Sequence, residues 1–239
     1  MVSVAYLVPG TAVAGGERER RERVANGLVS ANVSVVTADS GPPGIESVVE
    51  EAWAVPETLR KAHEIEDEYD AIVLGCFGDP GLRALRELVS VPVVGPAEAT
   101  LHTAAQVADR FGWLTILDRT VPMCRELLDR HGLAERCSGV RSVDAAVDDI
   151  GDDADALADR MVEVGRVAVE EDGAEALFPG CMSLAFAQRH ETVGDELGVP
   201  FLDPLALSLE QAATWARHGV AQSERSYPAP DVDRLSDLL

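Results

Sequence analysis

Lysine is almost absent from this sequence: Lys61 is the only one, and the other 19 of its 20 basic residues are Arg. Aromatic residues make up only 5% of the 239 positions. The 42 acidic residues outnumber the bases and give a formal net charge of −22 at pH 7. Nucleic-acid binding is therefore not expected, because phosphate contacts need a basic face. A spread acidic surface with so little lysine predicts a cytoplasmic protein of an extreme halophile.

Other absences exclude further classes of protein. Four Cys in 239 residues are too few for a disulfide scaffold. No run of about 18 apolar residues is present, so we expect no membrane-spanning helix. The apolar stretch from Val2 to Ala14 follows no basic segment and is interrupted by Pro9 and Gly10, so it predicts a buried strand and loop rather than a signal peptide. Metal-ligand spacings and glycine-rich nucleotide motifs are also missing, and we expect no metal and no cofactor.

Strand-like and helix-like segments alternate along the whole chain, which predicts an α/β fold with parallel sheets. The expected strands are Val2–Val8, Asn32–Ala38, Tyr69–Gly75 and Val91–Val94, then Trp113–Leu117, Gly139–Val143, Glu175–Phe178 and Pro200–Leu202. The expected helices are Glu17–Ser30, Pro56–Asp67, Pro80–Val89 with Asp79 as N-cap, Ala97–Arg110, Pro122–Arg130, Asp153–Glu171, Leu184–Leu197 and one after Pro204.

The two halves repeat the same landmarks in the same order. A threonine follows the first strand of each half, a Gly-Cys pair ends the third strand, and a similar hexapeptide ends the fourth. These landmarks are Thr11 and Thr120, Cys76 and Cys181, and VPVVGP at 91–96 and VPFLDP at 199–204. We expect two similar Rossmann-like domains related by a pseudo-twofold axis, one formed by residues 1–96 and 205–239 and the other by residues 97–204.

The matched cysteines suggest a chemistry. Cys76 and Cys181 each follow a central strand and precede an expected helix, where open α/β sheets bind ligands and a helix N-terminus lowers a thiol pKa. Two thiols on opposite walls of a cleft between the domains would let one remove a proton from carbon while the other returns a proton to the opposite face. The alternative is that both are buried structural cysteines, the role we assign to Cys124 and Cys137.

Three segments resemble one protein family. Asp70–Ala99 (DAIVLGCFGDPGLRALRELVSVPVVGPAEA), Leu114–Leu133 and Leu177–Ala185 are similar to the aspartate/glutamate/hydantoin racemase superfamily, on its hydantoin racemase branch. The resemblance implies two α/β domains with an active-site cleft between them, and cofactor-independent racemisation by Cys76 and Cys181 as the acid/base pair. It also implies a small-molecule substrate and a homo-oligomer.

The residues after each cysteine bear on the substrate. Amino-acid racemases of the superfamily follow their cysteines with Asn-Thr and Thr-Glu, whereas this chain has Phe77-Gly78 and Met182-Ser183. The difference favours a cyclic ureide, such as a 5-substituted hydantoin or allantoin, over a free amino acid. Two alternatives stay open: a single-cysteine decarboxylase or isomerase of the same superfamily, and a non-catalytic accessory protein of the hydrogenase-maturation type.

The remaining site residues are expected to bind the substrate. Backbone N–H groups around Phe77, Gly78 and Asp79, and around Met182 and Ser183, are the candidates for holding an enolate oxygen. The hydroxyls of Thr11 and Thr120 could donate hydrogen bonds, or could serve the turns in which they lie. Asp79 is better explained as an N-cap than as a catalytic acid. Glu98 is a candidate first-turn helix acid, and we expect surface or core roles for His102 and His190.

Self-repulsion among the acidic residues should make folding depend on salt. We expect the melting temperature to rise steeply between salt-free buffer and molar KCl, because counterions screen like charges on the folded chain. Calorimetry over a series of KCl concentrations measures this. Full stability in salt-free buffer would contradict the halophilic interpretation.

Overall fold

The structure is a computed structural model that describes residues 1–11, 13–147, 150, 154–235 and 237–239. The chain forms two compact units. The first contains Met1–Ile45, Val49–Pro96 and Ser208–Leu239, and the second contains Glu46–Val48 and Ala97–Leu207. We propose that these units are the two domains expected from the sequence, with residues 46–48 moved to the second one and its last residue at Leu207 rather than 204.

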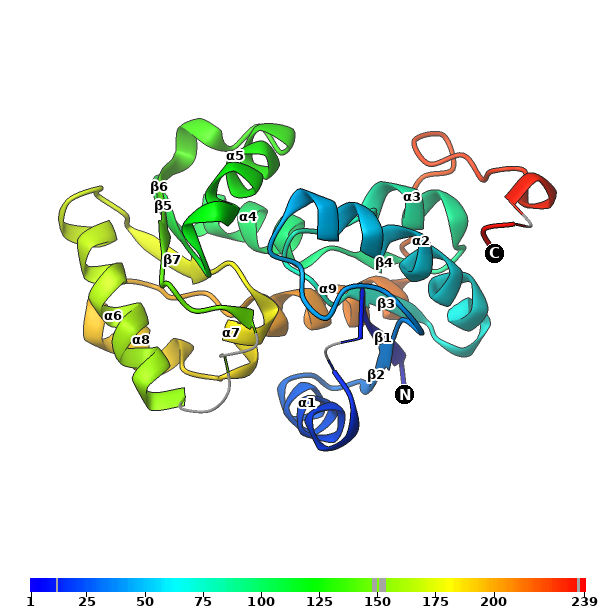
Figure 1. Ribbon diagram of the computed structural model, residues 1–239, viewed down its shortest axis with the longest axis horizontal. Coiled ribbons are helices and arrows are strands. Elements are labelled where there is room, and N and C mark those ends of the chain that lie inside the picture. Colours follow the sequence, from blue (N-terminus) through cyan, green and yellow to red (C-terminus); the bar gives the residue numbers. More distant parts are fainter. Residues whose placement is uncertain (12, 148–149, 151–153, 236) are drawn as a thin grey trace. The chain divides into compact units, whose positions relative to one another are not determined.

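The first unit is built on a four-stranded parallel sheet in the order β2-β1-β3-β4. Its strands are β1 (Ser3–Val8), β2 (Asn32–Thr37), β3 (Ala71–Leu74) and β4 (Val93–Val94). All of β3 and all but the first residue of β1 are buried, as expected for parallel strands that are covered on both faces. Figure 1 shows this sheet with the helices that connect its strands.

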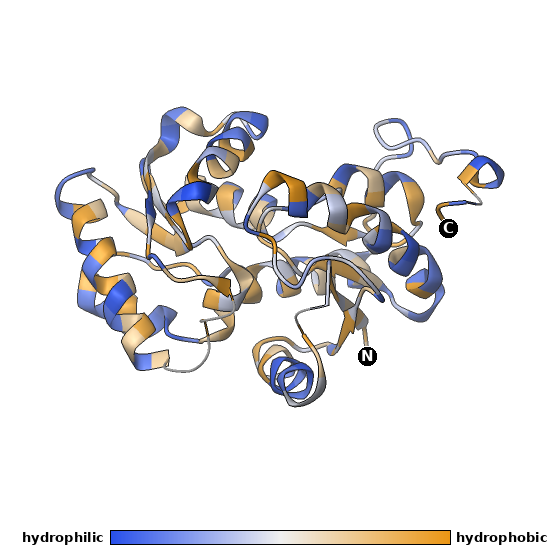
Figure 2. Cartoon of the chain, in the orientation of Figure 1, coloured by the Kyte–Doolittle hydropathy of each residue, from blue (hydrophilic) through white to orange (hydrophobic). Residues whose placement is uncertain are grey.

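The helices of this unit are mostly amphipathic connections. They are α1 (Gly15–Leu28), α2 (Val48–Ile65), the short η1 (Glu66–Glu68) and α3 (Leu82–Leu88), followed at the end of the chain by most of α9 (Pro204–His218) and by η5 (Val232–Leu235). Apolar side chains from β1, α2, β3 and α3 form one core cluster, which includes Leu7, Ile65, Ile72, Leu74 and Leu85. By contrast α1 is hydrophilic over most of its length (Figure 2).

The second unit has a three-stranded parallel sheet in the order β6-β5-β7. Its strands are β5 (Phe111–Thr115), β6 (Cys137–Ser142) and β7 (Ala176–Pro179). Its helices are α4 (Pro96–Val107), η2 (Asp118–Thr120), α5 (Val121–Arg130), η3 (Ala134–Arg136), α6 (Ala154–Glu170), α7 (Met182–Phe186) and α8 (His190–Leu197). Leu114, Met161, Leu177, Leu184 and Val193 are among the buried residues of its core. The α/β class with two parallel sheets is confirmed.

Several expected elements differ from the observed ones. The single helix expected over Leu184–Leu197 is two helices, α7 and α8, because Gln188 between them has a left-handed backbone with φ of 52°. Pro56, expected near a helix start, lies inside α2. The expected helix at Asp153–Glu171 begins in the described residues at Ala154, and Asp153 lies outside them.

The expected strand Pro200–Leu202 is reduced to one bridge between Leu177 and Phe201. The Leu177 N–H donates to Pro200 O, and the Leu202 N–H donates to Leu177 O. Phe201 thus lies beside β7 in the second unit, just as β4 lies beside β3 in the first unit. Within the described residues, no helix is both long and apolar enough to span a membrane.

Candidate active site

Each Gly-Cys pair directly follows a strand: β3 in the first unit, which pairs with β1, and β7 in the second unit, which pairs with β5. In the first unit Leu7 pairs with Leu74, and the Gly75 N–H donates to Leu7 O at 2.6 Å. In the second unit Leu114 pairs with Pro179, and the Gly180 N–H donates to Leu114 O at 2.7 Å. Cys76 and Cys181 therefore occupy corresponding positions at the carboxyl ends of β3 and β7.

Both glycines are required by the close approach of the neighbouring strand. A Cβ on Gly75 would lie 2.8 Å from both Leu7 O and Tyr6 Cε1. A Cβ on Gly180 would lie 1.6 Å from Nε1 of Trp113, the residue that corresponds to Tyr6 in the paired register. The aromatic side chain on the first strand occupies the space that a side chain on the glycine would need. Only glycine therefore fits directly before each cysteine.

Cys76 is followed by a turn rather than directly by a helix. The Asp79 N–H donates to Cys76 O at 3.2 Å, and α3 starts only at Leu82, with Gly81 as N-cap at φ 70° and no side-chain cap bond. The expectation that Asp79 caps a helix starting at Pro80 is wrong, because the left-handed residues 79 and 81 delay the helix by two residues. Gly78 lies beside the thiol, where a Cβ would be 3.9 Å from Cys76 Sγ.

Asp79 is buried, 2% exposed, with a left-handed backbone of φ 51°. Its carboxylate lies against the backbone of Gly95, because a Cβ on that glycine would be only 2.4 Å from Asp79 Oδ2. Gly95 directly precedes Pro96, the first residue of α4. Asp79 thus lies between the turn after Cys76 and Gly95, the residue before α4. Phe77, in the same turn, is 2% exposed.

Cys181 is the N-cap residue of α7 and has an extended backbone. The Ala185 N–H donates to Cys181 O at 3.1 Å and closes the first turn of this helix. Met182 and Ser183 form that turn and are both buried. The first N–H groups of a helix have no partner among its own carbonyls, and in α7 these groups belong to the residues directly after Cys181.

The two threonines occupy different settings. Thr11 is exposed, and its N–H donates to Pro42 O at 3.2 Å. Thr120 is buried, and its hydroxyl donates to Leu117 O at 2.7 Å. Its 2.7 Å contact with the Thr115 hydroxyl must therefore have Thr115 as the donor, because a hydroxyl has only one proton. Thr120 can offer a ligand only a lone pair in this arrangement, and its proton stabilises the turn after β5.

Cys124 and Cys137 are kept neutral by their surroundings. Burial raises the pKa of the Cys124 thiol to about 11, and the thiol donates to Thr115 Oγ1 at 3.6 Å. Burial also raises the pKa of Cys137 to about 11, where the thiol donates to Gly139 O at 3.4 Å. Neutral thiols are poor nucleophiles and bases.

The other candidate residues lie on helices. Glu98 is in the first turn of α4. His102, further along α4, is exposed and meets His131 edge to face at 5.5 Å between ring centroids. His190 begins α8, and its Nδ1 lies 3.6 Å from Oδ2 of the buried Asp203.

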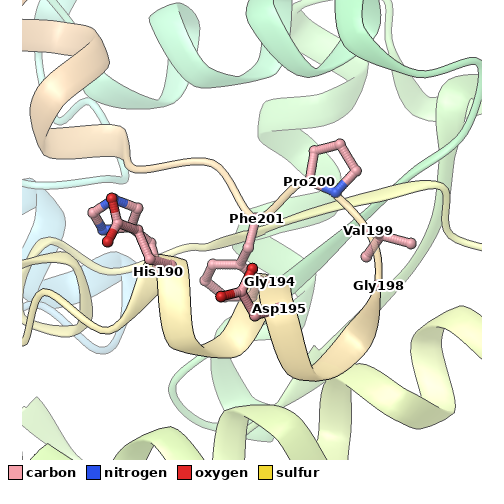
Figure 3. A pocket seen from close by; sticks show the side chains of 8 residues that line it. His190, Gly194, Asp195, Gly198, Val199, Pro200 and Phe201 are labelled. Carbon is pink, nitrogen blue, oxygen red and sulfur yellow. The ribbon is translucent and has the colours of Figure 1, made fainter.

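An open cavity of about 620 Å³ lies along α8 and residues 198–201. Figure 3 shows its lining, with His190 at the end away from Val199 and Pro200. Neither Cys181 nor another expected substrate-binding residue lines it. Among the described residues no three His, Cys, Asp or Glu side chains gather as metal ligands would.

Within the first unit β1 and β3 are paired neighbours, so the Thr11 loop and the Cys76–Asp79 turn follow adjacent strands, and the Thr11 N–H donates to Pro42 O. Within the second unit β5 and β7 are paired neighbours, so the turn that holds Thr120 and the start of α7 at Cys181 follow adjacent strands. Gln188 and Asp203, which join the end of α7 to the start of α9, were missed by sequence reasoning. The difference between VPVVGP and VPFLDP is the signal that could have found Asp203.

Comparison with known proteins decides the family. Residues 21–212 match the family model described as Asp/Glu/Hydantoin racemase. The chain belongs to the Asp/Glu/hydantoin racemase family. It is 35% identical over 201 residues to a protein named hydantoin racemase from Pseudomonas sp. (strain NS671), covering 83% of this chain and 80% of that one.

Solved structures agree with this assignment. Allantoin racemase from Klebsiella pneumoniae is 28% identical, with a TM-score of 0.88 over 97% of this chain and 94% of that one. Allantoin racemase from Pseudomonas fluorescens is also 28% identical, with a TM-score of 0.87 over 96% of this chain and 97% of that one. Family membership therefore extends over both units.

Replacing Gly180 with Ala should destabilise the second unit. The new Cβ must displace Trp113 or the backbone of β7, and such overpacking costs about 1–3 kcal/mol, so we expect a clear drop in the urea midpoint. Gly27→Ala is the matched control, because a Cβ there meets nothing within 4 Å and alanine favours the helix. Equal midpoints for the two variants would show that the approach to Trp113 is not tight.

Cys124 and Cys137 should resist alkylation in the folded protein. A thiol with a pKa of about 11 is ionised to roughly one part in a thousand at pH 8, and the thiolate is the reacting form. We expect iodoacetamide to leave both unmodified at pH 8 while the protein is folded and to label both in urea, as measured by peptide mass spectrometry. Fast labelling of either in the native protein would contradict the raised pKa.

Proposed function

We propose that this protein is a cofactor-independent racemase that inverts a carbon-acid stereocentre of a 5-substituted hydantoin or of allantoin. The observation that carries the proposal is the placement of Cys76 and Cys181. Each follows a glycine whose N–H donates to the corresponding residue of the first strand, Leu7 in one unit and Leu114 in the other. Membership of the Asp/Glu/hydantoin racemase family, with relatives named hydantoin and allantoin racemases, supports the same activity.

In the proposed mechanism the two units present their cysteines to opposite faces of one substrate in a cleft between them. One thiolate removes the proton from C5 of the ring, which the neighbouring C4 carbonyl makes acidic. The electron pair passes into the enolate, and the other cysteine donates its thiol proton to the opposite face of C5. No electron is gained or lost, and the next turnover can run from the opposite enantiomer with the two cysteines exchanging roles.

The enolate oxygen needs donors that are fixed before charge develops on it. We assign this role to backbone N–H groups of the Phe77–Gly78 turn and of Met182 and Ser183 at the start of α7. Gly78 leaves the space beside Cys76 Sγ open for a ring substituent or carbonyl. Asp79 is turned toward Gly95, so we assign it to holding the turn, and Thr120 to holding the turn after β5.

The substrate proposal rests on the residues directly after each cysteine. Phe77 and Met182 are apolar, and neither Gly78 nor Ser183 brings a charged side chain to pair with a carboxylate. A cyclic ureide is neutral at the carbonyls beside its stereocentre and needs hydrogen bonds rather than a cationic clamp. This favours the ureide over a free α-amino acid, whose carboxylate needs stronger recognition.

Four further proposals concern the setting of the activity. We propose that the enzyme is cytoplasmic, that it needs neither metal nor cofactor, and that it works as a homo-oligomer. We also propose that it is adapted to high salt. The charge of −22 and the single lysine support this adaptation.

Proton exchange at C5 in heavy water tests the proposed function. We expect proton NMR at molar salt to show loss of the C5 signal of hydantoins or allantoin well above the rate without enzyme. Cys76→Ala and Cys181→Ala should each lower racemisation by about 10³-fold, because general acid and base each contribute 10²–10⁴-fold. Each should keep exchange from only one enantiomer, and the two variants should keep opposite ones.

The matched control is Cys137→Ser, which removes a thiol that is neutral and lies on β6. It should racemise at the wild-type rate. If the wild-type protein exchanges no C5 proton in any of these compounds, the substrate proposal is wrong. If both active-site variants keep full racemisation, the two-cysteine mechanism is wrong.

A further inference from the structure

The two cysteine turns are supported by polar contacts of opposite arrangement. In the first unit the non-glycine residue with a left-handed backbone after the cysteine is Asp79, and its carboxylate lies against Gly95, the residue before α4. In the second unit the non-glycine left-handed residue is Gln188, and its partner Asp203 is the residue before α9. The carboxylate belongs to the turn after the cysteine in the first unit (Asp79). In the second unit it belongs to the segment after Phe201, the residue that pairs with β7 (Asp203).

A chain of hydrogen bonds runs from Cys181 to Asp203. The Ala185 N–H donates to Cys181 O at 3.1 Å, and Ala185 O accepts from Gln188 Nε2 at 2.9 Å. The same Nε2 donates to Asp203 Oδ2 at 3.1 Å. Asp203 Oδ1 accepts the Leu205 N–H at 2.9 Å and so caps the start of α9. The Gln188 side-chain amide therefore joins the end of α7, the helix that Cys181 caps, to Asp203 at the start of α9.

The Gln188 side-chain amide contacts both the end of α7 and the buried carboxylate of Asp203. α7 contains only five residues, and a helix of that length is not stable without tertiary contacts. Asp203 is 7% exposed, and a buried carboxylate must be paired by donors. Gln188 contributes to both needs, alongside the Leu205 N–H at Oδ1 and His190 Nδ1, which lies 3.6 Å from Oδ2. It does so with a left-handed backbone of φ 52°, a conformation that costs a non-glycine residue about 1–2 kcal/mol.

We infer that Gln188 and Asp203 are positioning residues for Cys181, acting through α7 and not by touching the substrate. This inference rests on the proposed function, because it concerns how one of the two proposed acid/base groups is aimed. Cys76 is supported separately by Asp79, so loosening the Gln188–Asp203 contact affects proton transfer at one cysteine and leaves the other intact.

The test variant is Gln188→Glu in the full chain, which replaces the amide donor by a second carboxylate facing Asp203. The matched control is Gln106→Glu, the same change at an exposed amide on α4. We expect Gln188→Glu to lower kcat about 100-fold, the cost of misplacing a reacting group by about 1 Å, with KM within about twofold. Gln106→Glu should keep wild-type values.

C5 proton exchange in heavy water distinguishes a displaced Cys181 from a general loss of folded structure. Gln188→Glu should lose racemisation but keep C5 exchange from the same enantiomer that Cys181→Ala keeps, because Cys76 still acts on it. The double variant Gln188→Glu with Asp203→Asn restores a donor and an acceptor, and it should recover part of kcat. Equal loss of exchange from both enantiomers, or loss that follows the melting temperature alone, overturns the inference.

A second measurement does not require turnover. The rate at which iodoacetamide labels Cys181, relative to Cys76 in the same sample, should change severalfold in Gln188→Glu and stay constant in Gln106→Glu. An unchanged ratio refutes the positioning role even if no substrate is found. Absence of C5 exchange in the wild-type protein, with a changed labelling ratio, instead refutes only the proposed function.

Discussion

The close contact between a glycine and the first strand of its own sheet fixes where each cysteine lies. Gly75 meets Tyr6 and Gly180 meets Trp113, and in both cases the glycine N–H extends the ladder by one bond. A side chain at either glycine would push the strand end away from its neighbour. Because the constraint is the same in both units, Cys76 and Cys181 occupy equivalent backbone positions. The proposed proton transfer on two faces of one substrate depends on this equivalence.

Beyond this shared contact the units differ in how they hold the residues after the cysteine. The first unit uses a tight turn in which the Asp79 N–H donates to Cys76 O, and it delays its helix until Leu82. The second begins α7 at once and then breaks it at Gln188. In both, a polar side chain from the turn, Asp79 or Gln188, contacts the residue before a later helix, α4 or α9. The two units therefore share the position of the cysteine at the strand end, but different residues hold the segment that follows it.

The sequence predicted the parts of the structure that depend on local pattern. Continuous apolar runs indicated β1 and β3, and the repeated Gly-Cys pairs identified corresponding strand ends. The break between α7 and α8 could not be predicted, because it depends on the contact of Gln188 with Asp203, 15 residues later. The position of Asp79 was also missed, since the Asp-Pro pair is typical of an N-cap, whereas its carboxylate lies against Gly95, 16 residues further along the chain.

Four cysteines of one chain show how position decides what a thiol can do. Cys124 and Cys137 lie where burial keeps the proton on sulfur, which suits packing and excludes base chemistry. Cys76 and Cys181 follow β3 and β7, directly after the glycines whose N–H groups donate to Leu7 O and Leu114 O. The proposed reaction needs one of these two ionised while the other is protonated. In the proposed mechanism the equivalent strand ends let the two cysteines exchange roles between the two directions of the reaction, and the proposed supports at Asp79 and Gln188 differ, so that each cysteine could be altered separately.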